Sequence, residues 1–387
     1  MPRLYTVSIL FLLLQSGTIL FYGIPIAVIL PVLMIPLLKS YRINLVYYKK
    51  ALLIISILGF FSLAQWWTFS GFLKSEALTL LNFLSVAVLV VVVGRRFVEL
   101  YTDLIVFLAI VSLFFYVGIL IVPGFPNVLA NFATIIPKYS EASSFFELKG
   151  GEETSVHLWF HHFNFDPDAN TRNNGIFYEP GRFAIYLILA IIFVLFVKKG
   201  GIYSWKLVLL TGTLLTTQST AGYLAFILIL YMYIFFSKTN IVFSILFFVL
   251  VVFITIYTLS LNFMSTKIAD EVVNVEEISR FGAILYHWEY IRDHLFLGYG
   301  NYMPKLLLSP NGLTLLILKH GLLLSVFLFY GIYKSFSTFS LVDSKLNRIQ
   351  VFCTLTFLIV SFSQTITTDP FFYAMSFFGY IGFSRAS

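Results

Sequence analysis

Charged residues are scarce in this chain. Asp, Glu, Lys and Arg make up 11% of its 387 residues, whereas an ordinary soluble domain holds about 25%. Cysteine is nearly absent too, because Cys353 is the only one, and this excludes an intramolecular disulfide. The run at 4–22 lacks a small-residue cleavage site, so we expect a retained span and no cleavable signal peptide. The shortage of charge excludes a soluble enzyme, a disordered tail and a nucleic-acid-binding protein.

Hydrophobic residues make up the difference. They account for 59% of the chain, with 44 Phe and 23 Tyr, which is more apolar surface than one buried core can hold. Spanning helices need about 20 largely apolar residues, and barrel strands alternate over about 10. Continuous apolar runs occur at 4–22, 24–38, 51–67, 77–93, 104–122, 182–197, 203–217, 220–236, 240–260, 312–333, 349–366 and 371–384. The sequence therefore predicts an all-α polytopic membrane protein with about twelve transmembrane helices.

The charges sort by side when the N-terminus is placed in the cytoplasm. The inner segments then hold 15 basic and three acidic residues, a net +12, and the outer side holds 10 basic and 15 acidic residues, a net −5. Basic residues favour the cytoplasmic face of spans. We therefore expect both termini in the cytoplasm, and basic residues that lie near anionic lipid and bind no nucleic acid.

Two long polar segments interrupt the runs, and both fall on the outer, periplasmic side. Loops of this length are uncommon and usually functional. In the second one, apolar residues recur every three to four positions over 280–294, which predicts an amphipathic helix on the membrane face. The predicted organisation is N-terminal transmembrane helices over 1–122, a first periplasmic loop over 123–181, central helices over 182–260, a second periplasmic loop over 261–311 and C-terminal helices over 312–387.

The end of the first loop holds the most informative stretch. Gly175 permits a tight bend, and Arg172 and Arg182 flank it at the predicted water–lipid boundary. A fixed pair of guanidinium groups suits a phosphate or pyrophosphate. The alternative is structural: Arg182 anchors the interface and Arg172 is a solvated loop residue. Glu179 followed by Pro180 predicts a helix start.

This stretch resembles the signature of the O-antigen polymerase and O-antigen ligase family. The similarity rests on four segments, which are Arg172-x-x-Gly175-x-Phe177-x-Glu179-Pro180, the link Thr216 to Gly222 between two spans, Arg280 followed by Trp288 and Leu297-Gly298-Tyr299-Gly300, and Asn311 followed by Gly321. The family's ligases carry His before the Asn, where this chain has Pro310. The link has Ser219-Thr220 where the family often has Ser-Arg. The missing His favours a polymerase.

The resemblance implies a metal-independent glycosyltransferase without a cofactor, acting on the periplasmic face of the bacterial inner membrane. Its substrate would be an undecaprenyl-pyrophosphate-linked oligosaccharide of O-antigen or a related surface polysaccharide, with a chain-length regulator and a flippase as partners. The pyrophosphate is a good leaving group, so the site mainly needs positive charge. The expected catalytic residues are Arg172, Arg280 and Glu179, with Glu179 as candidate base. The expected substrate-binding residues are Arg182, Lys319, Asn311, Tyr178 and His287.

Further readings stay open. Lys319 lies about eight residues into a span, where a charge faces a cavity or snorkels to the interface. His157, His161 and His162 have helical spacing, but exposed loop histidines are commoner than metal sites, and we expect no metal. The alternative functions are a ligase that transfers glycan to lipid A core, or a transporter or flippase of lipid-linked oligosaccharide. The sequence shows neither an internal repeat nor a clearly broken helix, both of which are typical of transporters.

Overall fold

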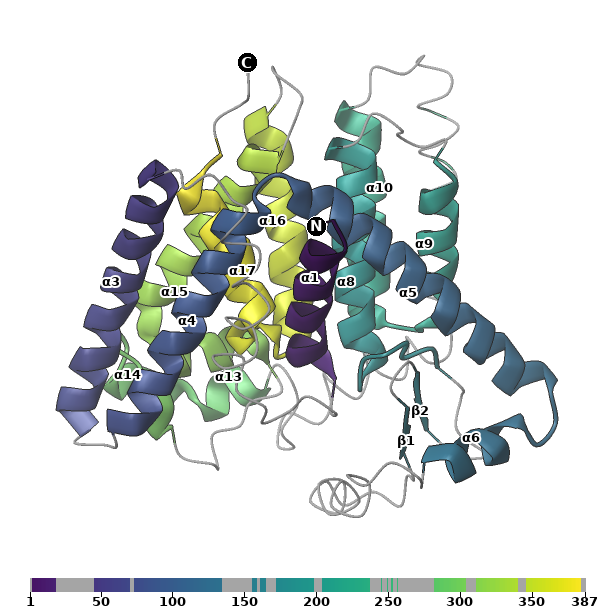
Figure 1. Ribbon diagram of the computed structural model, residues 1–387, viewed down its shortest axis with the longest axis horizontal. Helices are drawn as coiled ribbons and strands as arrows, with labels where there is room; N and C mark the ends of the chain where they lie inside the picture. The colour runs from purple at the N-terminus through teal and green to yellow at the C-terminus, as the bar shows by residue number, and fades with distance from the viewer. Residues whose placement is uncertain are drawn as a thin grey trace.

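The protein is a bundle of helices with one small hairpin. The computed structural model describes residues 2–18, 45–69, 73–133, 155–158, 161–164, 172–197, 204–236, 282–303, 311–339 and 346–383, and the single positions 245, 249, 252 and 256. The long elements are α1 (Pro2–Gly17), α3 (Leu45–Phe69), α4 (Leu73–Val93), α5 (Arg96–Ile121), α8 (Pro180–Ile192), α9 (Trp205–Thr216), α10 (Thr220–Phe236), α15 (Gly312–Phe339), α16 (Leu346–Ser363) and α17 (Pro370–Ile381) (Figure 1).

Helix length and hydropathy make this a multi-pass membrane protein. In the part of the chain that the structure describes, five stretches are long and apolar enough to cross a bilayer: Leu45–Phe69, Lys74–Val93, Arg96–Ile121, Pro180–Val197 and Gly312–Phe339. The fourth joins α8 to a π-helical turn, η2 (Phe193–Val197). Shorter apolar helices accompany them. Large apolar side chains face outward, such as Phe60 (69% exposed) and Val208 (72%), as lipid contact requires.

The predicted apolar runs agree with these helices wherever the structure describes them. The runs at 24–38 and 240–260 fall outside the described residues, apart from four single helical positions in the second. All the other runs fall on a helix. The all-α class is thus confirmed, while the total of twelve spans stays a prediction.

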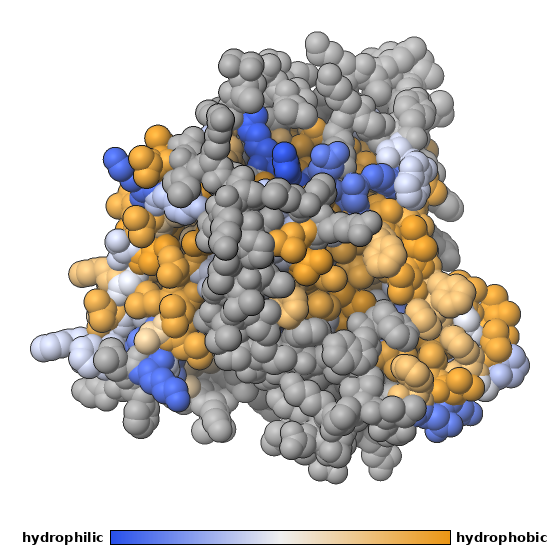
Figure 2. All heavy atoms as spheres, viewed as in Figure 1, coloured by the Kyte–Doolittle hydropathy of each residue, from blue (hydrophilic) through white to orange (hydrophobic). Residues whose placement is uncertain are grey.

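Basic side chains gather at one end of the bundle. Lys50 Nζ donates to the carbonyl oxygen of Ile381 over 2.8 Å, and Arg95 Nη2 donates to that of Phe383 over 2.8 Å. Figure 1 shows α1 beginning and α17 ending toward this end. In Figure 2 apolar residues cover the middle of the visible face, and hydrophilic residues gather toward its upper and lower ends. This pattern fits a bilayer around the middle of the bundle.

An aromatic core ties the central helices together. Phe97 on α5 stacks on Tyr101 with ring centroids 5.4 Å apart and meets Phe378 of α17 at 4.5 Å. The Tyr101 hydroxyl donates to the carbonyl oxygen of Tyr186 on α8 over 2.9 Å. Aromatic pairs at these separations add stability beyond their buried area. The core thus fixes α5, α8 and α17 against one another.

Helices α15 and α17 approach most closely where small residues meet. A Cβ added to Gly379 would overlap the carbonyl oxygen of Gly331, and one added to Gly331 would overlap Ser376. Small residues let helix backbones pack closely inside a membrane. This contact fixes the C-terminal part of α15 against α17.

Helix α15 corrects the expectation that no span is broken. Two helical arms, 312–320 and 322–339, meet at Gly321, whose φ of 71° and ψ of 169° are not helical. Such a backbone is accessible mainly to glycine. The break frees backbone groups, and the segment before α15 binds them: Leu322 N–H donates to Leu295 O, and Tyr299 N–H donates to Leu318 O, both over 2.7 Å. A broken span survives in a membrane only when such partners are present.

The histidines expected at helical spacing lie instead on a hairpin. Strands β1 (Ser155–His157) and β2 (His162–Asn164) pair antiparallel, with His157 opposite His162. Leu158 and Phe163 are buried against Leu129 of α6 (Phe125–Ala133), and this apolar contact holds the hairpin on the end of the bundle.

The expected amphipathic helix over 280–294 is two short helices. Helix α13 (Gly282–Tyr286) and helix α14 (Trp288–Asp293) are separated at His287, because the His287 carbonyl accepts the Ile291 N–H and starts the second helix. Ile291 is buried against Leu318 of α15, whereas Leu285 is 69% exposed. The segment therefore packs on the first arm of α15 through α14.

Candidate functional site

The bend before α8 is held by backbone hydrogen bonds. Gly175 has a φ of 58°, and a Cβ there would lie 2.8 Å from the Phe183 ring. Asn173 Oδ1 accepts the Gly175 N–H over 3.1 Å, and the Gly175 carbonyl accepts the His162 N–H over 2.7 Å. Tyr178 N–H donates to Gly17 O over 3.1 Å, which joins the bend to α1. The bend predicted from Gly175 is confirmed.

Arg172 joins this bend to the link between α9 and α10. Its Nε donates to Thr217 O over 3.2 Å and its Nη2 to Gln218 O over 2.8 Å. Gln218 has a φ of 47°, so the link turns sharply at the carbonyl that Arg172 binds. Arg172 is half-buried, and its guanidinium thus holds two segments on which the family resemblance rests.

Arg182 forms a buried ion pair. Its Nη1 lies 2.6 Å from Asp369 Oδ2 and donates to Ser16 O over 2.7 Å. Its Nη2 donates to the Thr365 hydroxyl over 2.9 Å, and the Tyr178 ring lies 4.5 Å from the guanidinium carbon. Arg182 is only 6% exposed. The two arginines that flank Gly175 therefore bind different elements, and the geometry favours the structural reading of Arg182.

Glu179 and Tyr178 complete the start of α8. Glu179 is the N-cap, and its carbonyl accepts the N–H groups of Arg182 and Phe183. Its side chain makes no capping hydrogen bond. Burial raises the pKa of the Tyr178 hydroxyl well above its ordinary value, so this phenol stays protonated.

A polar cavity lies between α3, α4, α15 and the turn before α15. Its volume is about 10 Å³, room for about one water molecule. Glu76 on α4 is 2% exposed; Ser62 donates to its Oε2, and Asn301 Nδ2 donates to its Oε1 over 2.8 Å. Asn301 also donates to Thr79 over 3.0 Å. A carboxylate is thus held at the cavity by two neutral donors.

Lys319 and His320 line the same cavity from α15. Among the residues that the structure describes, no carboxylate lies within ion-pair distance of the Lys319 ammonium, although Glu76 and Asp369 both interact with it electrostatically. His320 Nε2 and the Tyr373 hydroxyl form a hydrogen bond of 2.6 Å. The Lys319 ammonium therefore has no direct ion-pair partner among the described residues. Of the two alternatives for this position, a charge that faces a cavity fits better than one that snorkels to the interface.

The turn Leu297–Gly300 sits in the break of α15 and forms one wall of the cavity. A Cβ at Gly298 would overlap the Gly321 nitrogen, so only glycine permits this approach. Gln65 Nε2 from α3 donates to Leu297 O over 2.6 Å and to Lys319 O over 3.0 Å. A second pair of segments from the resemblance is thereby in contact.

The remaining predicted residues have structural surroundings or fall outside. Asn311 is fully buried, and its Oδ1 accepts the N–H groups of Leu313 (2.9 Å) and Thr314 (3.2 Å), so it caps α15. His287 is 1% exposed between α13 and α14. Arg280 lies outside the described residues.

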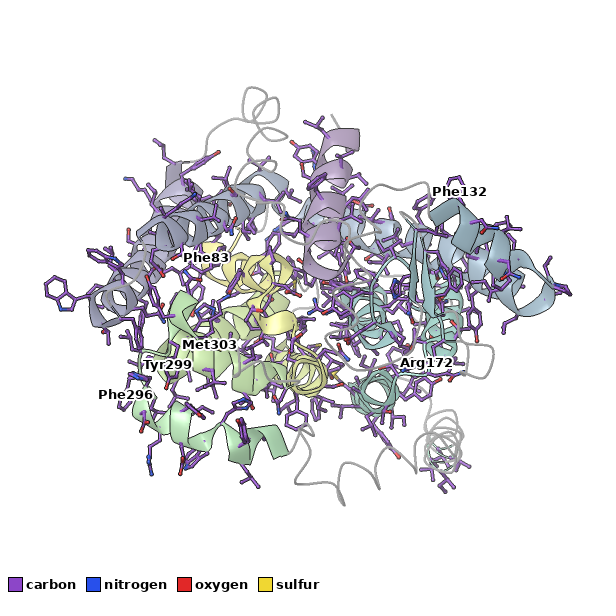
Figure 3. The ribbon with its side chains drawn as sticks, turned by 90° about the horizontal axis from the view of Figure 1, so that it is seen from below. Phe83, Phe132, Arg172, Phe296, Tyr299 and Met303 are labelled. Atoms are coloured by element: carbon purple, nitrogen blue, oxygen red, sulfur yellow. The ribbon has the colours of Figure 1, made fainter. Side chains whose placement is uncertain are left out.

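The structure separates Arg172 from the cavity. Figure 3 shows Arg172 on the other side of the bundle from Phe83, which lines the cavity, and from Tyr299 and Met303 of the adjoining turn. A single cationic site made by Arg172 and Lys319 together is therefore not present in this arrangement. Glu76 is the cavity residue that the sequence analysis missed; an acidic residue beside a predicted span was the available signal.

Four charges of alternating sign lie in a row between these regions. They are Glu76, Lys319, Asp369 and Arg182, and we call them the buried charge row. Alternation lets each charge offset the desolvation cost of its neighbours. Within the described ranges, three or more His, Cys, Asp or Glu side chains nowhere come together as a metal site would require.

Comparisons with protein families, with curated proteins and with solved structures find no match for this chain.

Proposed function

We propose that this protein is a membrane-embedded glycosyltransferase that polymerises undecaprenyl-pyrophosphate-linked oligosaccharide repeats. The reaction would take place on the periplasmic face of a bacterial inner membrane, where the 123–181 and 261–311 loops are expected. Twelve spans and two cytoplasmic termini belong to this proposal.

One observation carries it: segments far apart in the sequence, which the family resemblance singles out, contact one another in pairs. Arg172 binds the link between α9 and α10, and Gly298 packs against Gly321. Four weak motifs scattered by chance would have no reason to interlock. Their contacts in the structure support the resemblance independently of the residues that match the motifs.

The chemistry suits a site that supplies charge. An acceptor sugar hydroxyl attacks the anomeric carbon of the growing chain, and the bond to the lipid pyrophosphate breaks with its electron pair on the leaving oxygen. Arg280 is the candidate cation for the pyrophosphate. Arg172 is not offered for this role, because its guanidinium binds Thr217 O and Gln218 O and lies across the bundle from the cavity. Arg182 is not offered for this role, because Asp369 and Ser16 occupy its guanidinium.

The test is deletion of the gene followed by a gel of the surface polysaccharide. Loss of polymer with a single capped repeat remaining supports the proposal. Free polymer over a bare lipid A core indicates a ligase instead. Polymer of normal length in the deletion strain contradicts both.

Transport of lipid-linked oligosaccharide is a second candidate, and the broken α15 favours it. Discontinuous helices with nearby charged side chains are typical of transporters, and Lys319 lies two residues before the break. Purified protein in vesicles separates the two. A transporter moves labelled lipid-linked repeat between leaflets without lengthening it, whereas a polymerase lengthens it.

A further inference from the structure

Glu76 and Lys319 both line a cavity that has room for about one oxygen atom. Glu76 is 2% exposed, and the two side chains that donate to it, Ser62 and Asn301, are neutral. A buried carboxylate without a directly bonded cation is costly to maintain. The arrangement therefore calls for a ligand or water that bridges Glu76 to Lys319.

The polar groups around the space match a hydroxyl. An oxygen at its centre would donate its proton to Glu76 and accept a hydrogen bond from Lys319, and a volume of about 10 Å³ admits little more than that oxygen. Asn301 lines the space and is exposed, so the sugar that carries the hydroxyl and the anomeric carbon that the oxygen attacks would both approach from the side of Asn301.

The cavity also lies near the predicted outer end of the bundle, where the proposed reaction would take place. Glu76 is in the first turn of α4, directly after the outer end of α3, and Asn301 belongs to the second predicted outer loop. Glu179 is held differently, since it caps α8 beside the Arg182–Asp369 pair.

We propose that this cavity binds the acceptor sugar hydroxyl, with Glu76 as the general base and Lys319 as the cation that orients the oxygen. This inference rests on the proposed polymerase function. The hydroxyl proton passes to the Glu76 carboxylate as the oxygen bonds to the anomeric carbon. The bond from that carbon to the pyrophosphate breaks, the electron pair leaves with the pyrophosphate, and Glu76 later returns its proton to solvent.

The test uses purified full-length protein in lipid nanodiscs with a synthetic lipid-pyrophosphate-linked repeat. Glu76→Gln keeps the shape of the side chain but removes its basicity, so we expect kcat to fall at least about 100-fold with KM within about threefold. Glu289→Gln is the matched control, because Glu289 is exposed on α14, and it should retain the wild-type rate. A wild-type kcat for Glu76→Gln would overturn the inference.

A second variant keeps the inference testable if the Glu76→Gln protein accumulates poorly. Glu76→Asp keeps the charge but withdraws it by one methylene, so kcat should fall about tenfold or more. An unchanged rate would also overturn the inference. Failure of the wild-type protein to polymerise would instead refute the proposed function.

Discussion

The two ends of the buried charge row differ in how their charges are compensated. At one end, Arg182 contacts Asp369 directly and donates to Ser16 and Thr365, so the site is closed. At the other end, Lys319 and Glu76 face each other across a cavity without direct contact. Glu76 and Arg182 are thus buried at the two ends of the row, with the half-buried Lys319 and Asp369 between them, and the cavity lies at the second end.

This difference teaches how to sort buried charges in a membrane protein. A directly paired charge with satisfied hydrogen bonds serves the fold, and removing one partner exposes the full cost of the other. Removing a charged side chain beside a polar cavity costs less stability, because solvent or a neighbouring polar group already compensates the charge that remains. Stability and activity should therefore separate along the row.

The largest expected effect is on the closed end. Arg182→Met leaves Asp369 buried and unpaired, and we expect the free energy of unfolding to fall by about 3–5 kcal/mol. Denaturation in mixed detergent micelles measures this. The matched double variant Arg182→Met/Asp369→Leu should recover most of the loss. Wild-type stability in Arg182→Met, with lost activity, would move Arg182 into the substrate site.

The break in α15 comes next. At Gly321 an alanine must adopt a positive φ and would overlap the Phe296 carbonyl, so Gly321→Ala should destabilise the protein by about 2–4 kcal/mol. Gly212→Ala on α9 is the control, because nothing lies within 4 Å of the added Cβ. Equal stability of the two variants would mean that α15 can straighten at no cost.

At the cavity end of the row, a substitution should change activity strongly and stability little. Lys319→Met should change the free energy of unfolding by no more than about 1 kcal/mol, because Glu76 keeps its hydrogen bonds to Ser62 and Asn301. Polymer formation should nevertheless be lost in cells that lack the wild-type gene. A loss of stability as large as that of Arg182→Met would erase the distinction between the two ends.

Features set by residues close together in the sequence could be predicted from it, whereas features set by contacts between distant residues could not. The spans were predictable because bilayer thickness fixes the length of an apolar run, and the bend at Gly175 was predictable from local residue types. The charge row was not, because Arg182 and Asp369 lie 187 residues apart and Asn301 and Glu76 lie 225 apart. The break at Gly321 was missed for the same reason: it exists only because Gln65 and the 295–299 segment bind the freed backbone groups.

The last expected effect is absent at neutral pH and concerns a buried group that carries no charge. His161 is 1% exposed beside Phe115 and Phe163, and burial lowers the pKa of its imidazole to about 3. The unfolded chain, with a His pKa of about 6.5, therefore binds more protons between these values. Stability should thus fall by about 1.4 kcal/mol for each pH unit below about 6.5.

His161→Phe tests this at two pH values. At pH 7 the variant should lie within about 0.5 kcal/mol of the wild type, because Phe fills a site already lined by aromatic rings. At pH 5 the wild type alone should have lost stability from this group. An identical pH dependence in both proteins would show that His161 is not the responsible residue.

The glycine contact between α15 and α17 has a mechanical consequence for the cavity. Because Gly331 and Gly379 bring the two backbones together, the second arm of α15 and α17 must move as one rigid body. The break at Gly321 lies ten residues before Gly331, between that body and the arm that carries Lys319. The cavity wall that Lys319 and His320 form is therefore positioned separately from α17, by the contacts of Gly298 and Gln65 with the first arm, 312–320.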